Sequence, residues 1–203
     1  VDPDERYPAL TDSIFGFCIR SRRTCSASLC CSDALVGKQT KLELNLEELW
    51  RSSPPGEKVT LRKLVDKYFT LRSEPHKCIR GHWKDGRPAE QQVQEFMETE
   101  PLVLCIEIQR ASIEHAKDGT AVQRKSHRLV EFPEYLDFMR SGPYKLHGFI
   151  QHVGKDADCG HYTATVRLRD RTFGLFDDGK HVKIKYTHDF VDHCVQSEVC
   201  VLQ

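Results

Sequence analysis

Alternating apolar and polar positions in the last third of the chain predict β-strands. Residues Tyr144–His152 and His161–Leu168 are rich in β-branched and aromatic side chains, which favour strands. The segment Val153–Gly160 between them predicts a hairpin loop. After a turn at Arg169–Thr172, the run Phe173–Phe176 predicts the next antiparallel strand. Consecutive antiparallel strands would bring the residues after Gly160 and after Phe176 to the same end of one sheet.

The middle of the chain is predicted to form helices. We predict helices at about Leu46–Arg51, Leu61–Phe69 and Glu90–Met97. The second is supported by apolar residues that recur at helical intervals on one face. Ahead of the first helix, Leu42–Leu46 alternates as a strand.

Two polar segments of the middle region predict connections rather than strands or helices. Residues Ser52–Gly56 contain two prolines and a glycine and predict a turn. Residues Ala111–Lys125 are polar and predict a hairpin tip between a strand ending at Arg110 and one beginning near His127.

Composition fits an intracellular globular domain. The chain has 203 residues, 39% of them hydrophobic, and 30 basic residues balance 30 acidic ones. A net charge of zero gives no electrostatic footprint for nucleic acid or a membrane surface. No apolar run approaches the roughly 20 residues of a membrane span. The nine cysteines are an odd number without a signal peptide, so we expect free thiols and a cytoplasmic or nuclear location.

The candidate chemistry lies at the predicted sheet end, where His161 would face Asp177 and Asp178. A carboxylate that accepts one imidazole N–H fixes the tautomer, and the other ring nitrogen can then deprotonate a thiol. Gly160 fits this scheme because a residue without a side chain lets substrate backbone pass close to the histidine. The alternative is a surface histidine in a hairpin, one of ten in the chain.

The run from Tyr144 to Asp178, YKLHGFIQHVGKDADCGHYTATVRLRDRTFGLFDD, resembles the histidine box of the ubiquitin-specific proteases. These papain-like thiol enzymes are deubiquitinases. The resemblance continues over nearly the whole chain, in Ser13–Phe17, Leu61–Phe69, Pro101–Arg110, Val130–Asp137 and Ser197–Leu202.

The resemblance implies an α+β fold, with a mostly antiparallel β palm and fingers and a few helices. The fingers would occupy about residues 13–110 and the palm about residues 100–203 of a single catalytic region. It also implies roles for the side chains at the sheet end. His161 would be the general base, Asp177 its orienter, and Asp178 a support for the oxyanion or a water. Substrate-binding residues would be Gly160, Tyr162 and His152.

A nucleophile is not apparent. The family's cysteine stands in an N-terminal box within a thumb subdomain, and nothing in this chain resembles that box, so we expect the thumb to be absent. Cys159 lies two residues from His161, but a nucleophile usually comes from a separate element. Cys105 and Cys200, in apolar runs, are expected to be small buried hydrophobes. Cys18 and Cys194 have no distinguishing context.

The other cysteines suggest a metal. The family's fingers hold one structural zinc through two C-x-x-C knuckles, and the corresponding places here carry Cys25, Cys30 and Cys31, then Cys78 and His82. Zinc accepts mixed thiolate and imidazole ligands, so Cys25, Cys30 or Cys31, Cys78 and His82 could form a Cys3His site. Both spacings differ from the family's, and the alternative is a set of ordinary thiols. Catalysis itself would need no cofactor.

Three functions therefore remain open. The chain is a palm-and-fingers region of a working deubiquitinase whose nucleophile lies in a missing N-terminal thumb segment, or it binds ubiquitin or ubiquitinated proteins without cleaving them. The weaker third possibility is a zinc-bearing interaction domain.

Overall fold

The fold is described from a computed structural model, which covers residues 10–27, 31–52, 54, 57–78, 81–84, 86–115, 118–137, 142–157, 159–169, 172–185 and 199–202. The chain divides into two compact units. The first comprises Val1–Thr40 and Asp66–Leu102, and the second comprises Lys41–Val65 and Val103–Gln203. The fingers predicted at about residues 13–110 contain most of the first unit, together with residues 41–65 and 103–110 of the second.

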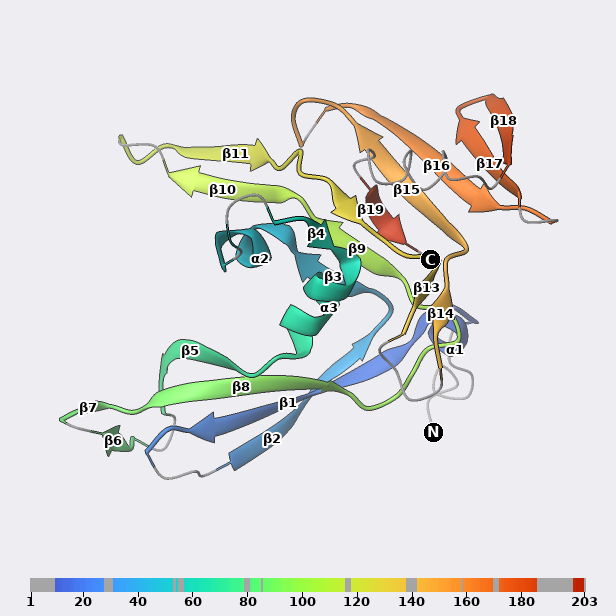
Figure 1. Cartoon of the computed structure of the whole chain (residues 1–203). Helices are drawn as coiled ribbons and strands as arrows, with labels where there is room; N and C mark the ends of the chain where they lie inside the picture. The colour runs from blue at the N-terminus through green and yellow to red at the C-terminus, as the bar shows by residue number, and fades with distance from the viewer. Residues whose placement is uncertain are drawn as a thin grey trace, which may run out of the picture. The chain divides into compact units, whose positions relative to one another are not determined.

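The first unit is built on a four-stranded antiparallel sheet in the order β2-β1-β8-β5 (Figure 1). Its strands are β1 (Phe17–Cys25), β2 (Cys31–Gln39), β5 (Arg72–Lys77) and β8 (Glu90–Met97). Helix α1 (Leu10–Phe15) precedes the sheet, and a small hairpin of β6 (Trp83–Lys84) and β7 (Arg87–Pro88) connects β5 to β8. Alternate residues of β1, among them Phe17 and Ile19, are buried as a strand with one covered face requires.

The predicted helix at Glu90–Met97 is wrong, because this segment is strand β8. Its burial alternates, with Gln91, Val93 and Glu95 facing inward. Two of these three inward residues are polar, so the period of two is hidden in the sequence. Glu95 is accommodated by an ion pair with Arg72 of the neighbouring strand, at 3.2 Å.

The second unit contains a seven-stranded sheet in the order β18-β17-β16-β15-β19-β9-β3 (Figure 1). All neighbours are antiparallel except β3 and β9, which are parallel. The strands are β3 (Leu42–Asn45), β9 (Ile106–Gln109), β15 (Gly148–Val153), β16 (His161–Arg167), β17 (Thr172–Asp177), β18 (Lys180–Lys185) and β19 (Val199–Leu202). Buried apolar residues from several strands, among them Leu44, Ile108, Phe149 and Phe173, form its core.

The two helices predicted after β3 are confirmed. Helix α2 spans Leu46–Ser52, and helix α3 spans Leu61–Phe69 with Leu61, Leu64 and Val65 buried. Each begins with a capping side chain that accepts a backbone N–H, Asn45 from Glu48 at 3.1 Å and Thr60 from Lys63 at 3.2 Å. Neither they nor the other helix of the described residues is long and apolar enough to cross a membrane.

The remaining strands of the second unit are short. The predicted hairpin tip at Ala111–Lys125 is itself a two-stranded hairpin of β10 (Ala111–His115) and β11 (Ala121–Lys125). The predicted strand Tyr144–His152 is interrupted at residues 146 and 147, which separate β14 (Tyr144–Lys145) from β15. Two further pairs complete the unit, β4 (Val59–Thr60) with β12 (Val130–Glu131), and β13 (Tyr135–Leu136) with β14.

Candidate functional site

His161 and Asp177 lie side by side at one end of the seven-stranded sheet. His161 is the first residue of β16 and Asp177 the last of β17, and the antiparallel register of these strands brings the two together. The Nε2 atom of His161 lies 2.5 Å from Oδ1 of Asp177. Their side chains are 46% and 47% exposed, so the pair is open to a reacting partner.

The carboxylates around His161 favour its protonated form. The hydrogen bond to Asp177 raises the pKa of His161 above its ordinary 6.5, and the charges of Asp177 and Asp178 act in the same direction. A carboxylate only accepts, so Nε2 carries the shared proton and Nδ1 is left to take a proton from a nucleophile. Asp178, in a two-residue turn, has a left-handed φ of 48°, a conformation that aspartate tolerates better than most residues.

Gly160 and the predicted substrate-binding residues form a packed group beside His161. A Cβ atom on Gly160 would lie 2.3 Å from Nε2 of His152 and 2.7 Å from the Val153 carbonyl oxygen. His152 is 4% exposed, and its ring packs against that of Tyr162 with the centroids 4.7 Å apart. Tyr162 is 60% exposed. Packing against the His152 ring and the Val153 carbonyl oxygen therefore requires glycine at position 160.

The loop between β15 and β16 is held from the end of β11. The Nζ atom of Lys125 donates to the carbonyl oxygens of His152 at 3.1 Å and Gly154 at 2.7 Å. Nε2 of His127 lies 3.0 Å from the carbonyl oxygen of Lys155. Sequence reasoning did not select Lys125 or His127, because a lysine and a histidine in a polar segment give no signal of such contacts.

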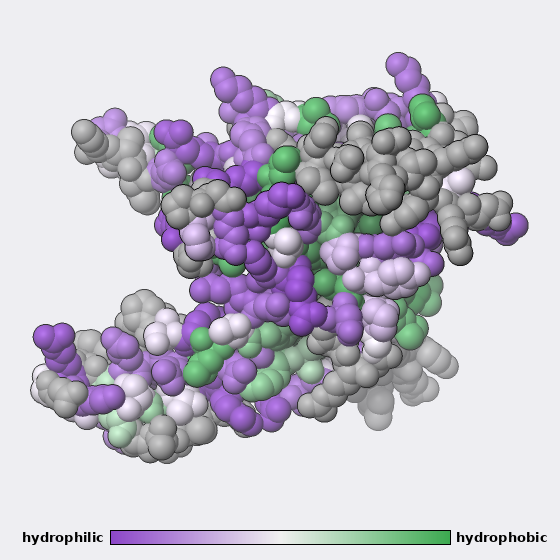
Figure 2. All heavy atoms as spheres, viewed as in Figure 1, coloured by the Kyte–Doolittle hydropathy of each residue, from purple (hydrophilic) through white to green (hydrophobic). Residues whose placement is uncertain are grey.

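A polar hollow of about 490 Å³ lies against the β10–β11 hairpin. Hydrophilic side chains gather over this part of the surface (Figure 2). Charged residues such as Glu47, Glu114 and Arg124 line the hollow, and neither His161 nor Asp177 is among its lining residues.

Five cysteines with described side chains are free thiols, and their surroundings differ. Cys159 is exposed in the loop before β16, and its Sγ atom lies 3.9 Å from Oδ2 of Asp156. Burial raises the pKa of the half-buried Cys105 thiol, which disfavours the thiolate. Cys18 is half-buried in the first unit. The predictions for Cys194, Cys30 and the side chain of Cys200 lie outside the described residues.

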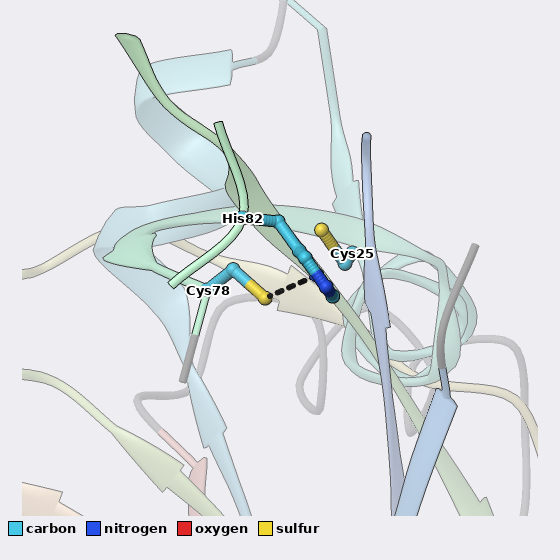
Figure 3. Close-up of side chains that lie close together, drawn as sticks. All are labelled: Cys25, Cys78 and His82. Atoms are coloured by element: carbon cyan, nitrogen blue, oxygen red, sulfur yellow. Dashed lines mark hydrogen bonds between the residues drawn. The ribbon is translucent and has the colours of Figure 1, made fainter. Parts of the chain in front are cut away.

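Three of the four predicted metal ligands meet in the first unit (Figure 3). The sulfur atoms of Cys25 and Cys78 and a ring nitrogen of His82 all lie within 4.8 Å of one another. Nδ1 of His82 faces Sγ of Cys78 at 3.4 Å. Both cysteines are buried beside Ala89.

The donor set of this cluster matches zinc chemistry. Four ligands about 2.3 Å from a tetrahedral zinc stand roughly 3.8 Å apart, which is compatible with the observed grouping. The backbone N–H of Ala27 donates to Sγ of Cys25 at 3.4 Å, a contact that stabilises a thiolate. A fourth ligand from Cys30 or the side chain of Cys31 lies outside the described residues.

The family follows from a comparison with known proteins. A family model described as "Ubiquitin carboxyl-terminal hydrolase" matches residues 2–199. This chain belongs to the ubiquitin carboxyl-terminal hydrolase family. Within that family, the resemblance of the histidine box to the ubiquitin-specific proteases is confirmed.

Two solved ubiquitin-bound structures share the fold of this member of the ubiquitin carboxyl-terminal hydrolase family. The SAGA DUB module of Ubp8, Sgf11, Sus1 and Sgf73 bound to monoubiquitin has a TM-score of 0.74 and 19% identity, covering 98% of this chain and 42% of that one. The same module bound to ubiquitin aldehyde gives 0.72 and 17%, covering 100% and 44%. The predicted α+β ubiquitin-specific protease fold is thereby confirmed.

A curated relative adds a similarity in sequence. "Ubiquitin carboxyl-terminal hydrolase 21" of Arabidopsis thaliana is 36% identical over 77 residues, covering 33% of this chain and 10% of that protein. The chain thus spans less than half of each of these three proteins.

Proposed function

We propose that this chain is the part of a thiol-dependent deubiquitinase that binds ubiquitin and supplies the histidine and aspartate of a Cys-His-Asp triad. The observation that carries the proposal is the 2.5 Å contact between Nε2 of His161 and Oδ1 of Asp177. It fixes the imidazole so that Nδ1 is available to a thiol. Membership of the ubiquitin carboxyl-terminal hydrolase family supports the reaction class.

In the proposed reaction, Nδ1 of His161 takes the proton of a cysteine thiol. The thiolate attacks the C-terminal carbonyl carbon of ubiquitin, and a tetrahedral oxyanion forms. The imidazolium then protonates the leaving lysine amine as the C–N bond breaks, and a thioester remains. Water, deprotonated by His161, hydrolyses the thioester and restores the thiol.

Asp177 acts through His161 in this scheme, and Asp178 adds negative charge beside the imidazolium. In this proposal Tyr162, exposed next to His161, contacts the ubiquitin tail, and the buried His152 supports Gly160 and Tyr162 from within the protein. We propose that the nucleophile comes from a segment outside these 203 residues, because no cysteine in the chain stands in a sequence that resembles the family's nucleophile box.

A second candidate function is ubiquitin binding without cleavage. The irregular spacing of the cluster at Cys25, Cys78 and His82 favours it, since this chain departs there from the knuckles of the family. We also propose that this cluster, with Cys30 or Cys31, holds a structural zinc. Such an ion would cross-link β1 to the turn after β5 and take no part in the chemistry at His161.

The test is hydrolysis of a fluorogenic ubiquitin amide by the protein extended with a segment that carries the nucleophile box. His161→Ala and Asp177→Asn should each lower kcat/KM by about 10²–10⁴-fold, the range of general acid–base catalysis. Asp118→Asn, which removes an exposed carboxylate from the β10–β11 tip, is the control and should leave the rate unchanged. Ubiquitin binding without turnover in the extended protein would favour the second function, and full activity of His161→Ala would refute the first.

A further inference from the structure

We infer that Lys125 is a positioning residue for the general base, because it fixes the loop that delivers His161 to Asp177. This inference rests on the proposed function of His161. It concerns contacts within the second unit alone.

Lys125 clamps the loop after β15 through the backbone carbonyls of His152 and Gly154. Lys125 is the last residue of β11, and its ammonium group bridges two carbonyl oxygens, those of His152 and Gly154. These carbonyls stand on both sides of Val153, where β15 ends and the loop begins. A charged donor forms stronger hydrogen bonds than a neutral one, and the half-buried position of Lys125 protects them from water.

The clamped residues contact the start of β16, where His161 lies. With its backbone held by Lys125, His152 places its ring beneath Gly160 and against Tyr162, the two residues that flank His161 in sequence. Val153, between the clamped carbonyls, pairs with His161 in the antiparallel register. Pairing with Val153 and contact with the His152 ring therefore fix the position of the start of β16.

The chain segment that carries Lys125 is itself anchored by Arg110. Arg110 is 4% exposed and donates to the carbonyl oxygens of Ser126 at 3.3 Å and Arg128 at 2.6 Å, just after β11. From the same segment, His127 contacts the carbonyl oxygen of Lys155. Lys125 thus projects from a segment that is itself tied to the body of the unit, so its two hydrogen bonds can locate the loop.

The test measures the pKa of His161 by NMR titration of its ring protons in the 203-residue chain. Lys125→Met keeps the length of the side chain and removes the donors. If the clamp positions His161, the contact with Asp177 loosens and the pKa of His161 falls toward 6.5, in the direction that Asp177→Asn produces. Loss of a positive charge alone would act in the opposite direction and raise that pKa.

The matched control is Lys155→Met, which removes the charge of an exposed lysine from the same loop. It should leave the pKa of His161 unchanged or slightly raised. Lys125→Arg retains a charged donor and should keep a value near that of the wild type. Thermal unfolding of each variant shows that the comparison is made on folded protein, and Lys125→Gln replaces Lys125→Met if the latter does not fold.

A pKa of His161 that is unchanged or raised in the folded Lys125 variants would overturn the inference and leave Lys125 a purely structural residue. The readout is separate from the proposed function. A fall in the pKa together with a failure of the extended protein to cleave ubiquitin would refute the enzyme and keep the positioning role.

Discussion

At His161, one hydrogen bond determines both the tautomer and the affinity for the proton. Asp177 accepts from Nε2 and raises the pKa of the ring, so the imidazolium formed after deprotonation of a thiol is stabilised where it is needed. Both groups are exposed, and solvent moderates this effect.

We expect the pKa of His161 to lie above 6.5 and to fall toward that value in Asp177→Asn, because the charged acceptor is lost. By linkage, a raised pKa adds stability that is fully present below pH 6.5 and is lost as the pH rises through the folded-state pKa. NMR titration checks the first statement, and urea unfolding of both proteins between pH 5 and 8 checks the second. Equal pH profiles for the two proteins would contradict the pairing.

Gly160 yields a second prediction. In Gly160→Ala the new methyl group would overlap the His152 ring and the Val153 carbonyl, and overpacking of this kind costs about 1–3 kcal/mol. Urea unfolding measures the loss. Gly179→Ala is the control, because its Cβ would have no heavy atom within 4 Å, and we expect a change within about 0.5 kcal/mol. Equal stability of the two variants would show that the glycine at 160 is not required by packing.

The His161–Asp177 contact was predictable from the sequence because it is local. Sixteen positions separate the two residues, and two alternating strands with a short turn determine where each one ends. The buried position of His152 and the clamp by Lys125 were not predictable. Lys125 reaches its carbonyl partners from 27 and 29 positions away, and its own neighbours give no sign of this contact.

At the scale of elements, β8 shows how neighbouring strands override local preference. Glutamine and glutamate are good helix formers, and Glu90–Met97 contains many of them. Pairing with β1 on one side and β5 on the other turns the segment into a central strand, which no local pattern predicted. Helix α3 was predicted correctly because its apolar residues and its Thr60 cap are all local.

The cluster of Cys25, Cys78 and His82 joins the end of β1 to the turn after β5, and we expect it to bind one zinc ion per chain. Cys78→Ser should abolish zinc binding and lower the melting temperature, since it replaces a buried ligand. Mass spectrometry of the metal content and calorimetry measure the two effects. Cys105→Ser, a half-buried thiol in the second unit, is the control and should keep the metal. Metal-free wild-type protein of unchanged stability after zinc addition would identify the cluster as ordinary buried thiols.

At the scale of the whole molecule, the two candidate sites are built from different units. The sulfur cluster draws its residues from the first unit, and His161 and its described partners all belong to the second. The described residues of each site thus all come from one unit. Their origin in different units is consistent with the proposed structural role of the sulfur cluster and the proposed chemical role of His161.

The proposed origin of the nucleophile outside these 203 residues can be tested on the chain itself. Ubiquitin that carries a thiol-reactive electrophile at its C-terminus should form no His161-dependent adduct with the 203-residue chain, because none of the five described thiols combines exposure with a contact to an imidazole that could activate it. Cys159, the exposed one, faces the carboxylate of Asp156 rather than an imidazole. Intact mass after incubation, with His161→Ala and Cys159→Ser in parallel, gives the answer. One ubiquitin added to the wild type and to neither variant would identify Cys159 as an activated nucleophile within this chain and overturn the proposal that the thiol comes from elsewhere.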